Sequence, residues 1–512
     1  MSLRLNRGSA WAGSMAVAVF AAVTACGGDG AVADGGGEPP VGPPADPRIA
    51  LVVDKGSDDG AEGTLRWAIT RSNAEPGKYR ITFKPDALTI RPVSELPSIV
   101  GPARIEGVAG SGGPSVVLDG VLLYDLKQVN AAGNPTACPG EADGQFGANV
   151  RSLKNAGLKV VDSGNVEIEG IEVRNFCTGI MILRSHDNRI RKVRLFNNLG
   201  ASGVLLTGDD GAGNPTSGKA INNLVEDSDF LNNSDSIDVA RGAEGSIIRN
   251  SIFRIDKDGV MPSQGIEVLS TNNVKIIGNI LAGFSEALQV SGDGHEISGN
   301  TLNGNAIAAT MRGNEGVFTD NVVHGNRMGL GTRGGTVTIS RNRIYDNGKD
   351  ISLCNAGGIC SGNANWMNAR LGISLNYSNG PVENDSAAMC ADGFPDCDTR
   401  QNVPVLLPTS GWAGGGYFLE GSLASRPSQA FVIEFFASRR AGLMDGRGEG
   451  ERFVGRLEIK TDASGNVRFS YPTGQLDPLG DGTTRVYFTA TATRVSNGQT
   501  SEFSRGVWID GP

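Results

Sequence analysis

The chain reads IIGN at 276–279, ISGN at 297–300, FTDN at 318–321 and ISRN at 339–342, and these four stretches decide the fold. Each begins 21 residues after the one before it, and a second column at the same period contains Asn305, Asn326 and Asn347. A fixed short period with asparagine and glycine columns is typical of a solenoid. Only short apolar triplets separate the turn residues, so each repeat is one turn of β-strands and not of helices. The sequence therefore predicts a parallel β-helix with structural asparagines at its corners.

Composition narrows the possible functions. Of 512 residues, 74 are glycine and only 20% are charged, which suits a structure built mostly of tight turns. The formal net charge is -9, and it becomes -11 without residues 1–25, which contain Arg4 and Arg7 but no acid. A chain this acidic is a poor partner for nucleic acid or for an anionic membrane surface. We therefore expect no nucleic-acid partner.

Residues 1–25 have the features of a secretory signal peptide, with Arg4 and Arg7 before an apolar run that is too short for a stable membrane span. Val23-Thr24-Ala25-Cys26 resembles a bacterial lipobox, which implies lipidation of Cys26; the alternative is an ordinary cleavage site with an incidental cysteine. Residues 26–47 have the composition of a disordered tether. The resemblance implies an exported lipoprotein of the outer membrane or cell surface of a Gram-negative bacterium, attached to the membrane through its lipid alone.

Six further cysteines form an even set, which in an exported chain indicates disulfides. Proximity favours Cys354 with Cys360 and Cys390 with Cys397, and this leaves Cys138 with Cys177. Metal ligation is the rival interpretation, but no histidine lies near these cysteines and the CxxC spacing is absent.

Residues 48–149 are expected to form a cap and the first coils. A short amphipathic helix is predicted from Thr64, as N-cap, to Ile69, and a solenoid needs such an element to cover its end. The run Gly63–Ile69, followed by Ile81–Phe83 and Arg104–Gly107, is similar to the start of bacterial surface proteins that carry the motif CSLREAI. This resemblance implies the N-terminal cap of a right-handed parallel β-helix of the pectate-lyase-like class.

Residues 150–365 are expected to form the β-helix itself. One strand of each coil should stack into a common sheet, with the middle residue of each triplet facing solvent. The expected triplets are 180–183, 204–206, 237–239, 266–268, 288–290, 309–311 and 330–332. Coils before residue 274 exceed 21 residues, and insertions such as 208–219 should project as loops.

The C-terminal part is expected to contain an acidic linker at 366–401 and a β-sandwich at 402–512. Apolar and polar residues alternate over Val432–Phe436 and Val486–Ala492, and Ser464-Gly465-Asn466 is a hairpin turn signal. These segments look like the sandwich module that ends many proteins of the same surface family. The predicted fold class is therefore all-β, a capped right-handed parallel β-helix followed by a β-sandwich.

A pair of acids is the main candidate site. In the outward column of the stacked sheet Asp238 and Glu267 fall on adjacent coils, about 4.8 Å apart. Such a pair can serve as acid and nucleophile on a glycoside or share a Ca²⁺ ion. Two residues along, Arg312 and Arg333 could bind uronate carboxylates or provide a base. The alternative interpretation is that the carboxylates form a solvated face.

Complete catalytic motifs are missing. Asn232–Asp238 faintly resembles the Asn-Thr-Asp-Gly run of polygalacturonase-like hydrolases, but the Asp-Asp pair and the Gly-His-Gly of that family have no counterpart. The Asp-Pro-His-Asp run of alginate epimerases is also absent. His186, His295 and His324 fall in predicted turns and are interpreted as surface residues.

A second candidate site lies in the linker. Asp385, Asp392, Asp396 and Asp398 offer oxygen ligands suited to Ca²⁺, the one cofactor the sequence indicates, although a solvated linker has the same composition. No EF-hand or GGxGxD repeat is present.

The architecture predicts shape better than chemistry. The leading hypothesis is a monomeric surface protein that binds a polysaccharide or a partner surface, in the manner of an adhesin. The alternatives are a polysaccharide lyase or glycoside hydrolase that uses Asp238, Glu267 and an arginine, and a structural spacer.

Overall fold

The computed structural model forms two units, Met1–Pro47 and Arg48–Pro512. The structure describes residues 46–84, 88–110, 113–128, 138, 156–209, 216–256, 264–332, 335–348, 359–369, 371–375, 381, 383–385, 401–442 and 447–512. The predicted signal peptide, Cys26 and almost all of the tether lie outside these residues. Among the described residues, no helix is long and apolar enough to cross a bilayer.

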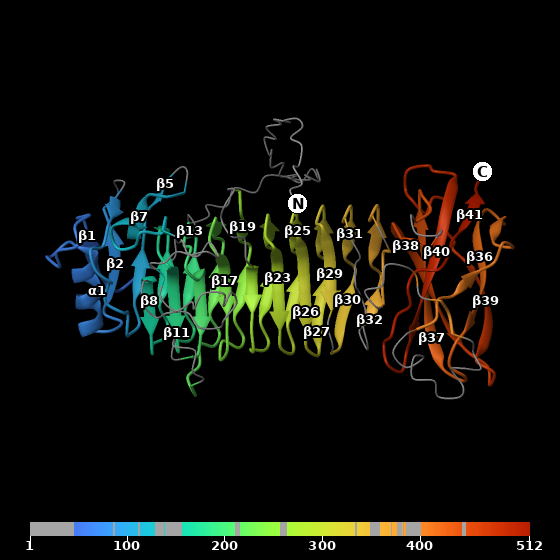
Figure 1. Ribbon diagram of the computed structural model, residues 1–512, viewed down its shortest axis with the longest axis horizontal. Coiled ribbons are helices and arrows are strands. Elements are labelled where there is room, and N and C mark those ends of the chain that lie inside the picture. Colours follow the sequence, from blue (N-terminus) through green and yellow to red (C-terminus); the bar gives the residue numbers. More distant parts are fainter. Residues whose placement is uncertain are drawn as a thin grey trace, which may run out of the picture. The chain divides into compact units, whose positions relative to one another are not determined.

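Three long parallel sheets form the body of the second unit, as predicted for a right-handed parallel β-helix, and Figure 1 shows the strands of successive coils lying side by side. Within the described residues, the largest sheet has 12 strands: β1 (Ile49–Val53), β2 (Tyr79–Phe83), β4 (Arg104–Glu106), β9 (Glu167–Glu169), β12 (Arg189–Arg191), β15 (Leu224–Glu226), β18 (Ile247–Arg249), β21 (Lys275–Ile277), β24 (Glu296–Ser298), β27 (Gly316–Thr319), β30 (Val337–Ser340) and β32 (Ile359–Ser361).

The second sheet has 11 strands in the part of the chain that the structure describes: β3 (Leu88–Ile90), β7 (Val116–Asp119), β10 (Ile171–Arg174), β13 (Arg194–Phe196), β16 (Asp229–Leu231), β19 (Ile252–Arg254), β22 (Ile280–Ala282), β25 (Thr301–Asn303), β28 (Val322–His324), β31 (Arg343–Tyr345) and β33 (Ala364–Trp366). A short hairpin, β5 (Ala109–Gly110) and β6 (Gly113–Pro114), and a 3₁₀ turn at Gly120–Leu122 accompany its first strands.

The third sheet contains all seven triplets predicted to stack together, and one earlier strand. Its eight described strands are β8 (Ala156–Val161), β11 (Thr178–Leu183), β14 (Ser202–Thr207), β17 (Asp235–Val239), β20 (Gln264–Val268), β23 (Glu286–Ser291), β26 (Ile307–Arg312) and β29 (Met328–Thr332). We call it the eight-stranded sheet.

Asparagine ladders close the corners between the sheets. Oδ1 of Asn300 accepts the backbone N–H of Asn279 at 2.9 Å and its Nδ2 at 3.0 Å, and Asn300 in turn donates to Asn321. The residue before each asparagine is left-handed, with φ of 66° at Gly278 and 56° at Asp320. The repeat seen in the sequence therefore encodes a turn and the buried amide that satisfies the backbone of the next coil.

The predicted N-terminal cap is present as α1 (Leu65–Ala74). The hydroxyl of Thr64 accepts the N–H of Trp67 at 3.2 Å, as an N-cap should. The expected face, with Leu65, Ala68 and Ile69, is buried against the first coils.

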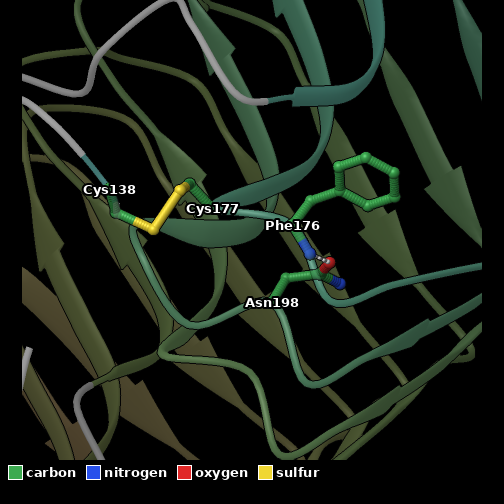
Figure 2. The surroundings of a disulfide bond; sticks show 4 residues. All are labelled: Cys138, Phe176, Cys177 and Asn198. Atoms are coloured by element: carbon green, nitrogen blue, oxygen red, sulfur yellow. Dashed lines mark hydrogen bonds between the residues drawn. A yellow bond between two sulfur atoms is a disulfide. The ribbon is translucent and has the colours of Figure 1, made fainter. Parts of the chain in front are cut away.

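A disulfide joins Cys138 to Cys177, immediately before β11, in agreement with the pairing predicted for these two cysteines (Figure 2). In the same turn the N–H of Phe176 donates to Oδ1 of Asn198. A Cβ on Gly200 would lie 2.3 Å from Sγ of Cys138, so the bridge requires glycine there. Cys360 is also disulfide-bonded, whereas Cys354, Cys390 and Cys397 lie outside the described residues.

The C-terminal β-sandwich consists of two antiparallel sheets, as the alternating sequence predicts. Among the described residues, one sheet contains β34 (Val405–Leu406), β35 (Gly411–Ala413), β36 (Gly416–Ala424) and β39 (Asn466–Pro472). The other contains β37 (Ala430–Ser438), β38 (Arg452–Lys460), β40 (Arg485–Arg494) and β41 (Val507–Asp510).

The sandwich supplies hydrogen-bond acceptors to the last coil. Glu449 accepts the N–H of Asn368 at 2.8 Å. Within a ladder, the asparagine of the following coil accepts this backbone N–H, so Glu449 replaces the missing asparagine after the last coil. Glu434 accepts the N–H of Gly362 at 2.8 Å and the hydroxyl of Ser361. Burial raises the pKa of both carboxyl groups. The sandwich therefore terminates the solenoid, a role that the sequence left open.

Candidate functional site

The two predicted acids lie on neighbouring strands of the eight-stranded sheet. Asp238 of β17 is the register partner of Glu267 of β20, as the alignment of the coils predicts. Asp235 joins them, and one carboxylate oxygen of each residue lies within 4.8 Å of the others. We call these three residues the acid cluster.

The sequence did not predict Asp235 as a member of the cluster, because the alternation of inward and outward residues is interrupted in β17. Ser236 and Ile237 are consecutive residues and both are fully buried. Ser236 faces the core. Gly203 lies opposite it on β14, and a Cβ on Gly203 would be 3.1 Å from the ring of the buried Phe230. Two inward residues in succession return Asp235 to the same outward side as Asp238.

The acid cluster is buried, so its interpretation as a solvated face is wrong. The exposed fractions of Asp235, Asp238 and Glu267 are 3%, 5% and 3%. Met181 and Leu205 occupy the same outward column on β11 and β14, and they are 0% and 3% exposed. The outward side of these strands is therefore covered, and the expectation that the middle residue of each triplet faces solvent fails here.

Amide groups order the cluster. The backbone N–H of Gln264 donates to Oδ1 of Asp235 at 2.8 Å, and the side chain of Gln289 donates to Oε1 of Glu267 at 2.9 Å. The side chain of Gln264 donates to Oε1 of Gln289 at 3.1 Å, which links the two contacts. These bonds hold the carboxylates of Asp235 and Glu267 in place.

Two buried hydroxyls extend the polar surface toward β11. Ser202 is the register partner of Asp235, and Thr178 lies at the matching position of the next strand. They are 0% and 1% exposed, and neither hydroxyl has a hydrogen-bond partner within the described structure. Buried polar groups rarely stay unpaired, so these hydroxyls are available to a bound molecule or to water.

Arg312 does not join the acid cluster. Arg312 is exposed at the end of β26, opposite Ser291. Two strand spacings, roughly 10 Å, separate β26 from β20. Arg312 also lies two residues further along its strand than Thr310, the residue level with Glu267. Arg333 lies outside the described residues.

A hard divalent cation would find suitable ligands in the acid cluster. Among the described residues, the acid cluster alone brings three or more potential metal ligands together. Its donors are all carboxylate oxygens, which suit Ca²⁺ or Mg²⁺. Of the ligands predicted in the linker, Asp392, Asp396 and Asp398 lie outside the described residues. Asp385 exchanges backbone and side-chain hydrogen bonds with Asn402.

The prediction that all three histidines lie on the surface is wrong for His295, which is 2% exposed. Its Nδ1 accepts the N–H of Val274 at 3.2 Å, as an asparagine does in the ladders, and burial lowers its pKa. His324 stacks on Tyr345 with 5.0 Å between ring centroids. His186 is half exposed and contacts Asp187. None of them lies in the acid cluster.

The topology and the capped coils define a right-handed parallel β-helix protein. The chain is 32% identical over 464 residues to the 3-dehydroshikimate dehydratase of Acinetobacter baylyi, across 82% of this chain and 88% of that protein. It belongs to the family of that protein.

A family model and two solved structures are also similar to parts of this chain. Residues 143–314 match the family model of NosD, described as a periplasmic copper-binding protein. The A-module of the mannuronan C-5 epimerase AlgE6 from Azotobacter vinelandii covers 62% of this chain and 87% of its own, at 14% identity and a TM-score of 0.41. An alginate lyase from Paenibacillus sp. covers 64% of this chain and 99% of its own, at 14% identity and a TM-score of 0.34.

Proposed function

We propose that the protein is a dehydratase that eliminates water from 3-dehydroshikimate or a closely similar cyclic keto acid. The observation that carries the proposal is the 32% identity extending over 88% of the Acinetobacter dehydratase. The aligned length includes the coils that carry β17 and β20, and we place the reaction at the acid cluster because three buried carboxyl groups meet there.

The reaction needs a base and an acid. The ketone acidifies the hydrogen on the neighbouring carbon. A base removes this proton, the C–H electron pair forms a C=C bond, and the hydroxyl on the next carbon leaves with its bonding pair and takes up a proton to become water. No oxidant or reductant is consumed, and tautomerisation of the remaining ketone completes an aromatic ring.

The acid cluster can supply both groups. Acid–base elimination uses one ionised and one protonated carboxyl in the same site, and neighbouring carboxyls can divide these roles. We assign the two roles to Asp238 and Glu267, and we assign Asp235, Ser202 and Thr178 to binding the substrate hydroxyls. If the three carboxylates instead hold a cation, that cation would polarise the ketone oxygen in place of the protonated carboxyl. The burial of the cluster suits a small substrate better than a polymer.

Binding of a polysaccharide or a partner surface stays the alternative, together with elimination from an acidic polysaccharide, which is the same class of reaction. Export through residues 1–25 and anchoring through Cys26 are also part of the proposal. The Cys138–Cys177 bridge supports export, because disulfides persist in oxidising compartments.

The test incubates the purified full chain with 3-dehydroshikimate and, separately, with alginate and polygalacturonate. We expect an aromatic product from the keto acid and none from the polymers. Unsaturated oligosaccharides without turnover of the keto acid would replace the proposal with a polysaccharide lyase. Silence on every substrate from folded protein would favour the binding role.

A further inference from the structure

A stack of aromatic rings lies on the outward side of the 11-stranded sheet, far along the chain from the acid cluster. His324, Tyr345 and Trp366 are register partners on β28, β31 and β33. The ring centroids of Tyr345 and Trp366 are 4.4 Å apart with planes 14° from parallel, and those of His324 and Tyr345 are 5.0 Å apart at 4°. Each ring therefore covers a face of its neighbour.

The stack ends at Trp366, because β33 is the last strand of its sheet. Arg343 does not cover the outer face of Trp366. Its guanidinium carbon lies 5.9 Å from the Tyr345 centroid and 5.7 Å from the Trp366 centroid. Nearly equal distances to two parallel rings place this cation beside their edges. Trp366 instead lines a cavity of about 290 Å³ with Met367, Arg439, Arg440 and Glu451. We call it the Trp366 pocket.

The acids around the Trp366 pocket already have partners. Glu449 accepts the N–H of Asn368, and Glu451 pairs with Arg439, which also binds Asp481. Arg440 is exposed, and within the described residues it has no ion pair or side-chain hydrogen bond. The pocket therefore combines the aromatic side chain of Trp366 with a guanidinium group that is available to an anion.

We propose that the Trp366 pocket binds a six-membered ring that carries a carboxylate. The ring extends the stack on Trp366, and the carboxylate pairs with Arg440, whose planar fork matches it. The volume, at the lower end for ligand sites, suits one ring. A uronate residue of an acidic polysaccharide and a free cyclic acid share this chemistry. The site is separate from the acid cluster, so it does not depend on the proposed dehydratase activity.

Isothermal titration of the full chain with D-galacturonate, shikimate and neutral D-galactose tests the proposal. We expect at least one acid to bind, and Arg440→Ala and Trp366→Ala each to weaken that binding at least tenfold. Tighter binding of galacturonate would identify a polysaccharide unit as the natural ligand, and tighter binding of shikimate a small cyclic acid. D-galactose should bind at least tenfold more weakly than D-galacturonate.

Two control variants separate this site from other effects. His324→Ala removes the far ring of the stack and should leave the affinity within twofold of wild type. Glu267→Gln alters the acid cluster and should leave the affinity for D-galacturonate unchanged. The proposal is overturned if neither acid binds, or if Arg440→Ala, a surface change that keeps the fold, binds both acids as wild type does.

Discussion

The coils from β21 to β31 and the coils that carry β14, β17 and β20 share the same three sheets, yet they use buried polar residues differently. In the first region every coil has 21 residues, and the buried asparagines Asn300, Asn305 and Asn321 satisfy the backbone of the neighbouring coil. In the second, register partners are 33 and 29 residues apart, and buried carboxylates lie on the outward side in addition to ladder asparagines such as Asn233. The coils of constant length contain buried polar residues that stabilise the scaffold, whereas the candidate site lies in coils whose length departs from 21 residues.

The largest expected effect is on activity. Glu267→Gln removes a proposed proton-transfer group, so kcat/KM for 3-dehydroshikimate should fall by about 10²- to 10⁴-fold. The melting temperature should stay close to wild type, since glutamine keeps the shape of the side chain. Glu296→Gln, a carboxylate on β24 paired with Lys275, is the matched control and should keep full activity. Equal losses of kcat/KM in both variants would show that the acid cluster has no particular role in catalysis.

The next effect is on stability in the regular coils. Asn300→Ala leaves two buried donors of Asn279 without their acceptor, which should lower the free energy of unfolding by about 4 kcal/mol. Activity per folded molecule should not change. Denaturant unfolding measures this, with Asn303→Ala, a half-buried position on β25, expected to cost less than about 1 kcal/mol. A small loss from Asn300→Ala would mean that the ladders are dispensable.

The disulfide should contribute somewhat less. Cys138→Ser with Cys177→Ser opens a bridge between residues 39 apart in sequence, and should cost about 2 to 4 kcal/mol. Thermal unfolding of the double variant should match that of wild type measured with a reductant that opens this bridge alone. A variant as stable as oxidised wild type would show that the bridge does not support the fold.

These three effects separate what the sequence could predict from what it could not. The 21-residue period predicted the sheets and the ladders, because register follows directly from a repeat. The alignment of the apolar triplets predicted the pairing of Asp238 with Glu267 in the longer coils. Asp235 escaped because two successive inward residues break the alternation. Burial of the acid cluster was not predictable, because strand alternation tells which side of the sheet a residue faces and not whether that side is covered. The aromatic stack does have a signal in the sequence that went unrecognised, because His324, Tyr345 and Trp366 are themselves 21 residues apart.

The smallest expected effect is the pH dependence of the junction between solenoid and sandwich. Burial raises the pKa of Glu434 above its ordinary 4.5, so the folded state holds this proton more tightly than the unfolded state. Its contribution to stability is therefore lost as the pH rises from about the ordinary pKa through the folded pKa. Glu434→Gln should flatten the decline in melting temperature over this range.

The control for the junction is Glu458→Gln, an exposed position on β38, which should keep the wild-type pH dependence. The same slope in Glu434→Gln and wild type would mean that Glu434 ionises as freely in the folded protein as in the unfolded chain.

The most direct test of the central claim follows 3-dehydroshikimate by NMR in the presence of wild type and of the double variant Asp238→Asn with Glu267→Gln. The account predicts that wild type converts the keto acid to an aromatic product with release of water, and that the folded double variant does not. Equal conversion by both proteins, or none by folded wild type, would contradict the assignment of the acid cluster as a dehydratase site.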